Sequence, residues 1–176
     1  MNWTILDSEC VFDCPWIRIR KDHVRLPSGT EIPDFYISEL PDWVNIIAIT
    51  KDNRFLVEEQ YRHGIQQICY ELPAGDVGPG EDPLSAAKRE LEEETGYSGG
   101  EWLYNGTYVP NASGANSRCH SFIAKNVEKR GEQQLEITED IKIHLLSEEE
   151  IKTVLNNGLM PEGVMAAPLW KYFANK

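Results

Sequence analysis

GDVGPGEDPLSAAKRELEEETGY, residues 75–97, predicts a glycine-rich loop followed by a helix with several carboxylates on one side. Glu90, Glu93 and Glu94 share a face because positions i, i+3 and i+4 are neighbours on a helix. Like charges at this spacing repel by about 0.2–0.5 kcal/mol per pair, and a cation reverses the sign of that energy. Clustered carboxylates suit Mg²⁺ or Mn²⁺ better than zinc. The alternative is a solvated helix face, since glutamate is a good helix former.

The ends of this helix are well defined in the sequence. Asp82 is an expected N-cap, Pro83 suits the first helical position, and Gly96 suits the residue that ends the helix. Arg89 lies four residues before Glu93, so the two are expected to pair and to hold that carboxylate in place. A separate, mostly apolar sector that can dock on a sheet is formed by Leu84, Ala87, Leu91 and Thr95.

The stretch also matches a longer pattern, G-x5-E-x7-R-E-U-x-E-E-x-G-U, where U is a bulky apolar residue. It resembles the Nudix box of the Nudix hydrolases, with Tyr97 as a mild departure from the usual aliphatic residue. The resemblance implies an α/β/α sandwich with a mixed β-sheet from about residue 41 onward. It also implies that Glu90, Glu93, Glu94 and the backbone carbonyl of Ala74 bind Mg²⁺, with Mn²⁺ as a substitute, and that the enzyme splits a pyrophosphate bond.

The residues ahead of the box narrow the resemblance. ELPAG at residues 71–75 and QYRHG at residues 60–64 are similar to the branch of ADP-ribose pyrophosphatases and other nucleoside diphosphate sugar hydrolases. In that branch Arg62 would contact phosphate through its planar fork, and Glu71 would orient a ribose or a metal-bound water. A surface salt bridge for Arg62 and a strand-edge ion pair for Glu71 are the alternatives. Pro110 is the substrate-binding proline expected after the box, but it lies too close to the box for a clear ADP-ribose signature. A diphosphonucleoside hexose therefore fits as well.

The general base of this branch is usually a glutamate on a loop well after the box. Glu136 and Glu139, in QLEITEDI, are the two candidates, and the sequence favours neither over the other or over a solvated acidic loop. Arg89 is grouped with these catalytic candidates through its pairing with the box acids. Three aromatic residues could stack on a base or pack in the core: Trp16, Tyr36 and Trp43.

The 176 residues suit one domain with a small appendage. Residues 1–40 are predicted to form an antiparallel β segment that is too small to be stable alone, and residues 41–176 the Nudix domain. Further strands are expected at 43–50, 54–61, 66–72, 101–109, 118–125 and 141–146. A helix is expected after Ser147, and another over 162–174 with Val164, Ala167, Leu169, Trp170 and Phe173 facing inward.

Charge and composition exclude several classes of protein. The net charge is −12 and no basic patch is present, so nucleic-acid binding is not expected. No apolar run is long enough for a membrane helix and the N-terminus does not resemble a signal peptide, so a cytoplasmic protein with four reduced cysteines is expected.

The branch implies a homodimer that acts on a nucleoside diphosphate sugar. Two competing functions are hydrolysis of a nucleoside triphosphate and a catalytically silent module that senses nucleotide sugars.

Overall fold

The computed structural model describes residues 2–15 and 17–176, which divide into two compact units. The first unit contains the residues before Asp42 together with the loop Val109–Arg118, and the second contains Asp42–Tyr108 and Cys119–Lys176. The loop with Pro110 therefore groups with the N-terminal residues, whereas the predicted boundary at residue 41 placed it in the Nudix domain. Within the described residues, no helix is both long and apolar enough to cross a membrane.

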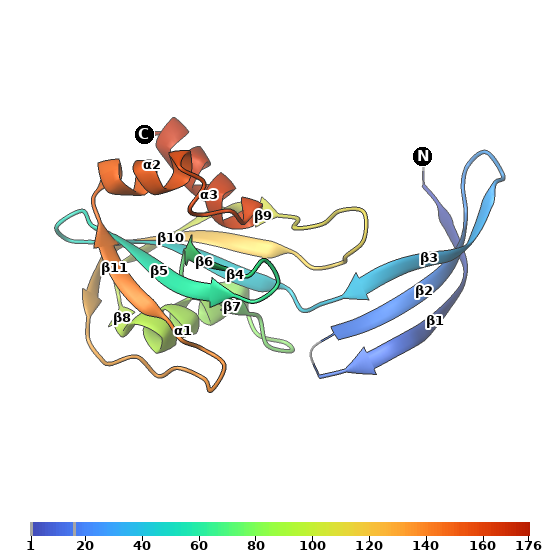
Figure 1. The fold of residues 1–176 in the computed structure, drawn as a ribbon, viewed down its shortest axis with the longest axis horizontal. Helices are drawn as coiled ribbons and strands as arrows, with labels where there is room; N and C mark the ends of the chain where they lie inside the picture. The colour runs from blue at the N-terminus through green and yellow to red at the C-terminus, as the bar shows by residue number, and fades with distance from the viewer. Residues whose placement is uncertain (1, 16) are drawn as a thin grey trace. The chain divides into compact units, whose positions relative to one another are not determined.

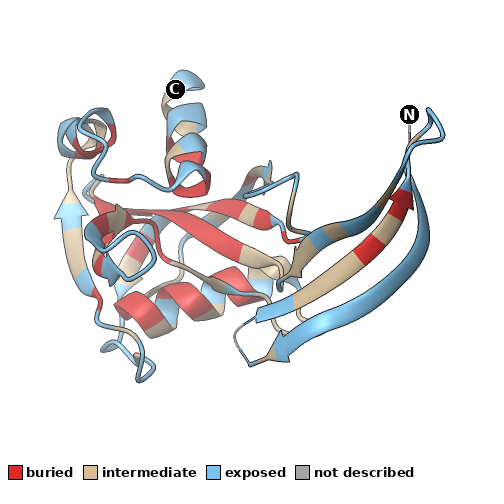
Figure 2. Ribbon diagram, turned by 45° about the vertical axis from the view of Figure 1, so that its right-hand side comes forward, coloured by how far each residue is buried: buried red, intermediate tan, exposed pale blue. Residues whose placement is uncertain are grey.

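The first unit is a three-stranded antiparallel sheet in the order β1-β2-β3, with strands at Thr4–Cys14, Ile17–Arg25 and Glu31–Glu39. The predicted Pro27–Gly29 turn joins β2 to β3, and Gly29 has the positive φ of 89° that such a turn requires. Few side chains of this sheet are buried (Figure 2). Its exposed large hydrophobic side chains are Trp3, Ile5, Leu6, Val11, Phe12, Ile17 and Tyr36.

The second unit is built on an eight-stranded mixed sheet (Figure 1). Its main path runs β11-β5-β4-β10-β8, with β6 on β5, β7 on β4 and β9 on β10, and β4 is parallel to β10. The strands are β4 Trp43–Thr50, β5 Phe55–Arg62, β6 Gln67–Glu71, β7 Ala74–Asp76, β8 Tyr97–Ser98, β9 Glu101–Tyr108, β10 Cys119–Lys129 and β11 Lys142–Leu146. The short strands β7 and β8 were not predicted, because so few residues carry no periodic signal.

Helices cover both faces of this sheet, which confirms the predicted sandwich (Figure 1). Alternate residues of β4 point to opposite faces. Ile46 packs in the core under α1, Pro83–Thr95, and Ile47 packs in the core under α2, Glu148–Asn156, and α3, Gly163–Ala174. The inward face of α3 is the one error in the predicted helices. Ala167 and Trp170 are exposed, while Met165 and Pro168 are buried in their place, so the buried face is shifted around the helix.

The path of the chain opens a gap between β4 and β5. These two strands pair only at Ile49 and Phe55, and beyond that point β5 pairs with β6 while β4 pairs with β7. Because Leu72 and Pro73 are all that separates β6 from β7, the chain crosses from one strand to the other just before the helix. This crossing places the Ala74–Gly75 backbone directly beside α1.

Candidate metal and active site

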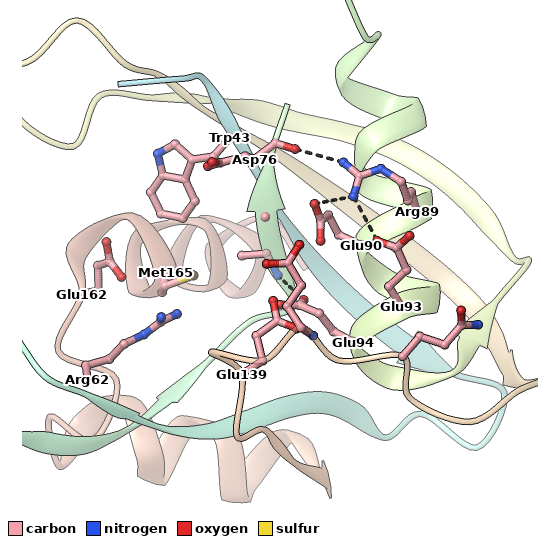
Figure 3. A pocket seen from close by; sticks show the side chains of 14 residues that line it. Trp43, Arg62, Asp76, Arg89, Glu90, Glu93, Glu94, Glu139, Glu162 and Met165 are labelled. Carbon is pink, nitrogen blue, oxygen red and sulfur yellow. Dashed lines mark hydrogen bonds and ion pairs between the residues drawn. The ribbon is translucent and has the colours of Figure 1, made fainter. Parts of the chain in front are cut away.

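A cavity of about 550 Å³ lies beside the face of α1 that carries Glu90, Glu93 and Glu94, and most of its polar lining is acidic (Figure 3). The helix begins as predicted, because Asp82 accepts a hydrogen bond from the Ser85 N–H, and it ends at Gly96 with a φ of 72°. Seven carboxyl groups line the cavity: Asp76, Glu90, Glu93, Glu94, Glu136, Glu139 and Glu162. They come from β7, α1, the loop before β11 and the start of α3, so the fold gathers acids from distant parts of the chain.

The backbone between Ala74 and Gly75 touches two of the helix acids. The Ala74 N–H donates to Glu94 Oε2 at 2.8 Å, and a Cβ added at Gly75 would overlap the carboxyl group of Glu90. Glycine is therefore required at residue 75 for the close approach of β7 to α1, although its φ is not positive. This contact leaves Glu90 and Glu94 pressed against the strand, while Glu92 is exposed on the outer side of the helix.

Arg89 organises the rest of the acidic cluster. Its Nη1 donates to Glu90 Oε1 at 2.7 Å and to Glu93 Oε2 at 3.0 Å, so the predicted pairing with Glu93 is present. Its Nε and Nη2 donate to the two carboxylate oxygens of Glu81, and Nη2 also donates to the Asp76 carbonyl. Hydrogen bonds to carboxylates raise the pKa of Arg89, and those to Glu81 have the largest effect. Glu81 also accepts from the Gly78 N–H, so it ties the glycine-rich loop to Arg89.

A further acid, Glu58 of β5, lies behind this cluster and was not predicted. Its residue is 4% exposed and its Oε1 has no hydrogen-bond partner. Burial raises the pKa of Glu58, and the nearby Glu71 carboxylate raises it further; burial and then Glu58 raise the pKa of Glu94. Burial also raises the pKa values of Glu90, Asp76 and Glu162. Gathering so many carboxyl groups around one cavity costs free energy unless a cation neutralises them.

The donors in the cavity fit a hard divalent cation. Carboxylate oxygens and a backbone carbonyl are the ligands that Mg²⁺ and Mn²⁺ prefer, and Glu58 leaves a buried acceptor unpartnered beside them. In the arrangement described here Glu90 and Glu93 turn toward Arg89. No three acidic, histidine or cysteine side chains of the described residues are therefore already gathered around one metal position. The predicted ligands Glu90, Glu93, Glu94 and Ala74 all line the cavity, so they could hold a cation if the carboxylates turned from Arg89.

We expect the thermal stability of the metal-free protein to fall as the pH rises from about 6 to about 9. A carboxyl group whose pKa is raised by folding stabilises the protein while it is protonated, and that stability is lost as the pH passes the raised pKa, as for Glu58 and Glu94. Melting temperatures in EDTA across this range measure the effect, and added Mg²⁺ should recover more stability at the higher pH. A Glu94→Gln variant should show a flatter pH profile. Equal profiles for the two proteins would contradict this origin of the effect.

The other residues singled out in the sequence lie as follows. Arg62, Glu136 and Glu139 line the cavity. Arg62 Nε donates to Glu71 Oε1 at 2.7 Å and its Nη2 pairs with Glu71 Oε2, so Glu71, which is 2% exposed, anchors the guanidinium. The Glu136 N–H donates to Glu139 Oε2 at 2.8 Å. Pro110 is not among the residues that line this cavity.

The aromatic candidates separate in a similar way. Trp43 lines the cavity and Tyr36 is 55% exposed in the other unit, while Trp16 lies outside the described residues. The four cysteines are free, as expected for reduced thiols. Sequence reasoning missed Glu58, Asp76 and Glu162. A signal did exist for Glu58. It lies two residues after Leu56 in β5, so both side chains point to the same face of the sheet, which is the face covered by α1.

Comparison with known proteins places the chain in a family. Residues 40–162 match a family model described as the NUDIX domain, and residues 3–38 match one described as the nucleoside diphosphate sugar hydrolase N-terminal domain. The chain is 35% identical to a methanol dehydrogenase activator from Bacillus methanolicus over 71% of this chain and 67% of that protein. It is 29% identical to an ADP-ribose pyrophosphatase from Bacillus subtilis over 83% and 80% of the two chains. The crystal structure of an ADP compounds hydrolase superposes with a TM-score of 0.85 at 18% identity, covering 99% of this chain and 94% of the other.

Proposed function

Because this chain belongs to the Nudix family and is a Nudix pyrophosphohydrolase, we propose that it hydrolyses nucleoside diphosphate sugars with the help of Mg²⁺. The products are a nucleoside monophosphate and a sugar phosphate. The observation that carries the proposal is the acidic cavity beside Gly75, within residues that match the NUDIX domain, in a chain whose residues 3–38 match the N-terminal domain of nucleoside diphosphate sugar hydrolases.

The cavity has the parts that this reaction needs. Glu90, Glu93, Glu94 and the Ala74 carbonyl would hold the divalent cation, which supplies neutralisation of phosphate charge and lowers the pKa of water when it is bound. Arg62 lies at the other end of the cavity from Arg89 (Figure 3). With two of its N–H groups held by Glu71, the guanidinium is fixed in direction and keeps further donors for a phosphate oxygen.

Of the two candidates for the general base, we propose Glu139. Its negative charge contributes to the raised pKa values of both Glu90 and Glu94, so its carboxylate faces the helix acids. The Glu136 N–H holds one of its oxygens, which leaves the other to accept a proton from the attacking water. Glu136 contributes instead to the raised pKa of Asp76. Glu139 therefore lies nearer to the residues placed to bind the cation.

A Glu139→Gln variant is expected to lose about tenfold to a hundredfold in kcat at neutral pH, because an amide cannot accept the proton. The loss is smaller than for a metal ligand, since Glu136 on the same turn can take over part of the role. Steady-state rates across pH measure it, and the acidic limb of the profile should be much weaker in the variant. Glu136→Gln is the matched control and should stay within threefold of the parent. The reverse ranking of the two variants would assign the base to Glu136.

A substrate panel tests the reaction itself. ADP-ribose, UDP-glucose, GDP-mannose and NADH should be incubated with the protein and Mg²⁺, and the phosphate-containing products identified by chromatography. We expect a nucleoside monophosphate and a sugar phosphate from at least one nucleotide sugar, and no reaction in EDTA. Turnover of nucleoside triphosphates alone would favour the first competing function. Binding of a nucleotide sugar without turnover would favour the silent sensor.

We also propose that the protein is a homodimer assembled through its N-terminal sheet. A single three-stranded sheet buries little of its own surface, and nine large hydrophobic side chains of this unit remain exposed. A second copy would cover them. Light scattering after gel filtration should give the mass of two chains, and Phe12→Asp, at a residue that is 53% exposed, should shift it toward one. A parent protein that elutes with the mass of a single chain would contradict the proposal.

A further inference from the structure

A second hollow, which we name the side pocket, adjoins the acidic cavity. It has a volume of about 450 Å³, and its walls include Ile65, Cys69 and Pro161. Arg62 and Glu162 line both the side pocket and the acidic cavity, so these two residues form the border between them. The volume lies in the range of about 300–1,000 Å³ that is typical of small-molecule sites. A ligand with its phosphates against Arg62 could therefore extend into the side pocket.

The walls and the border of the side pocket differ in chemistry. The walls are mostly non-polar, whereas the border carries the Arg62 guanidinium and the Glu162 carboxylate, and the Glu71 carboxylate lines the pocket beside Arg62. Glu162 precedes α3 but makes no capping hydrogen bond with its side chain, so its oxygens are not used by the helix. Glu71 is occupied on one side by Arg62, and each of its oxygens retains a lone pair. These oxygens suit a ligand that donates hydroxyl groups at one edge.

The charges at the border exclude an anionic occupant. Arg62 is the one arginine or lysine among the residues that line the pocket, and it is already paired with Glu71, while Glu162 adds a second carboxylate. A further phosphate in the pocket would therefore be repelled. A nucleobase is a poorer match, because the small imidazole of His63 is the one aromatic ring among the described lining residues, which include no Phe, Tyr or Trp. The occupant that remains is a neutral ring with hydroxyls along one edge and C–H groups on a face.

From this arrangement, and resting on the function proposed above, we infer that the side pocket binds the sugar of the substrate and that this sugar is a hexose. The hydroxyl groups of a hexosyl ring would donate to the carboxylates of Glu71 and Glu162. Its C–H face would lie on Ile65, Cys69 and Pro161. A ribosyl group is smaller and would leave part of the non-polar wall in contact with water, so the pocket should favour the hexose.

The test compares ADP-glucose with ADP-ribose, because the two share their base and diphosphate and differ in the sugar. The parent is expected to have the higher kcat/KM for ADP-glucose. Ile65→Trp should fill the pocket from its rim, where residue 65 is 52% exposed and can be enlarged without disturbing the core. We expect it to lower kcat/KM for ADP-glucose about tenfold or more and to leave ADP-ribose within about twofold. Glu162→Gln should shift the ratio in the same direction.

Ile68→Trp is the matched control, since Ile68 is 65% exposed on the same hairpin but does not line the side pocket. It should change neither rate. Equal losses on both nucleotides in Ile65→Trp, or no loss on either, would overturn the inference. So would a parent protein that prefers ADP-ribose, although the proposed function would then still stand. A parent that hydrolyses neither nucleotide sugar, nor any other of the panel, would instead overturn the proposed function.

Discussion

Glu94→Gln is expected to lower kcat by about 10³-fold or more, which corresponds to about 4 kcal/mol of transition-state stabilisation. Glu94 is buried against the strand, and its Oε2 accepts from the Ala74 N–H. An amide oxygen keeps that hydrogen bond, so the local structure should persist, but a neutral ligand binds a divalent cation far more weakly than a carboxylate does. Glu90→Gln should behave in the same way. The loss should appear in single-turnover rates as well as in kcat.

Stability separates this loss of function from a loss of fold. Because burial raises the pKa of Glu94 to about 10, its carboxyl group must take up a proton when the metal-free protein folds at neutral pH, and this costs stability that a neutral glutamine does not lose. The melting temperature of Glu94→Gln in EDTA should therefore equal or exceed that of the parent, while the rise on adding Mg²⁺ should shrink. Glu92→Gln provides the control, because it removes the same charge from the exposed side of the same helix. Full turnover in Glu94→Gln and Glu90→Gln together would contradict the role of the helix acids.

Gly75→Ala is expected to cost about 10²–10³-fold in kcat/KM, the second-largest effect. A methyl group at residue 75 would occupy the space of the Glu90 carboxyl group, which is the end of a flexible side chain and can move aside. The fold should survive because the side chain yields before the backbone does. A ligand displaced by about 1 Å nevertheless costs about a hundredfold in rate. Rates should be measured over a range of Mg²⁺ concentrations, because weaker cation binding should raise the concentration needed for half-maximal activity.

The control for this substitution is Gly131→Ala. A Cβ at Gly131 meets no atom within 4 Å and its φ is not positive, so an ordinary glycine-to-alanine change is tested there. That variant should retain the activity of the parent. If Gly75→Ala kept both its rate and its Mg²⁺ dependence, the close approach of β7 to α1 would have no part in holding Glu90. A crystal structure of Gly75→Ala would show directly whether the carboxyl group moves.

Local patterns in the sequence determined the helix acids and the ends of α1. The spacing of Glu90, Glu93 and Glu94 is a property of any α-helix, and Asp82 and Gly96 act on the residues beside them. The same is true of the pairing of Arg89 with Glu93, which needs only one turn of helix. These features involve neighbours within a few residues, so they could be predicted before the fold was known.

Only the tertiary structure decided which distant residues join the helix acids. Glu58 lies behind Glu94 because β5 and β4 separate beyond Phe55 and the chain returns through β6 and β7. The hairpin of β5 and β6 holds Arg62 on Glu71, and the start of α3 supplies Glu162 to the border of the side pocket. The positions of Glu58 and Glu162 beside the helix acids depend on the order of strands in the sheet, and spacing along the chain carries no record of that order because a sheet pairs residues far apart in sequence.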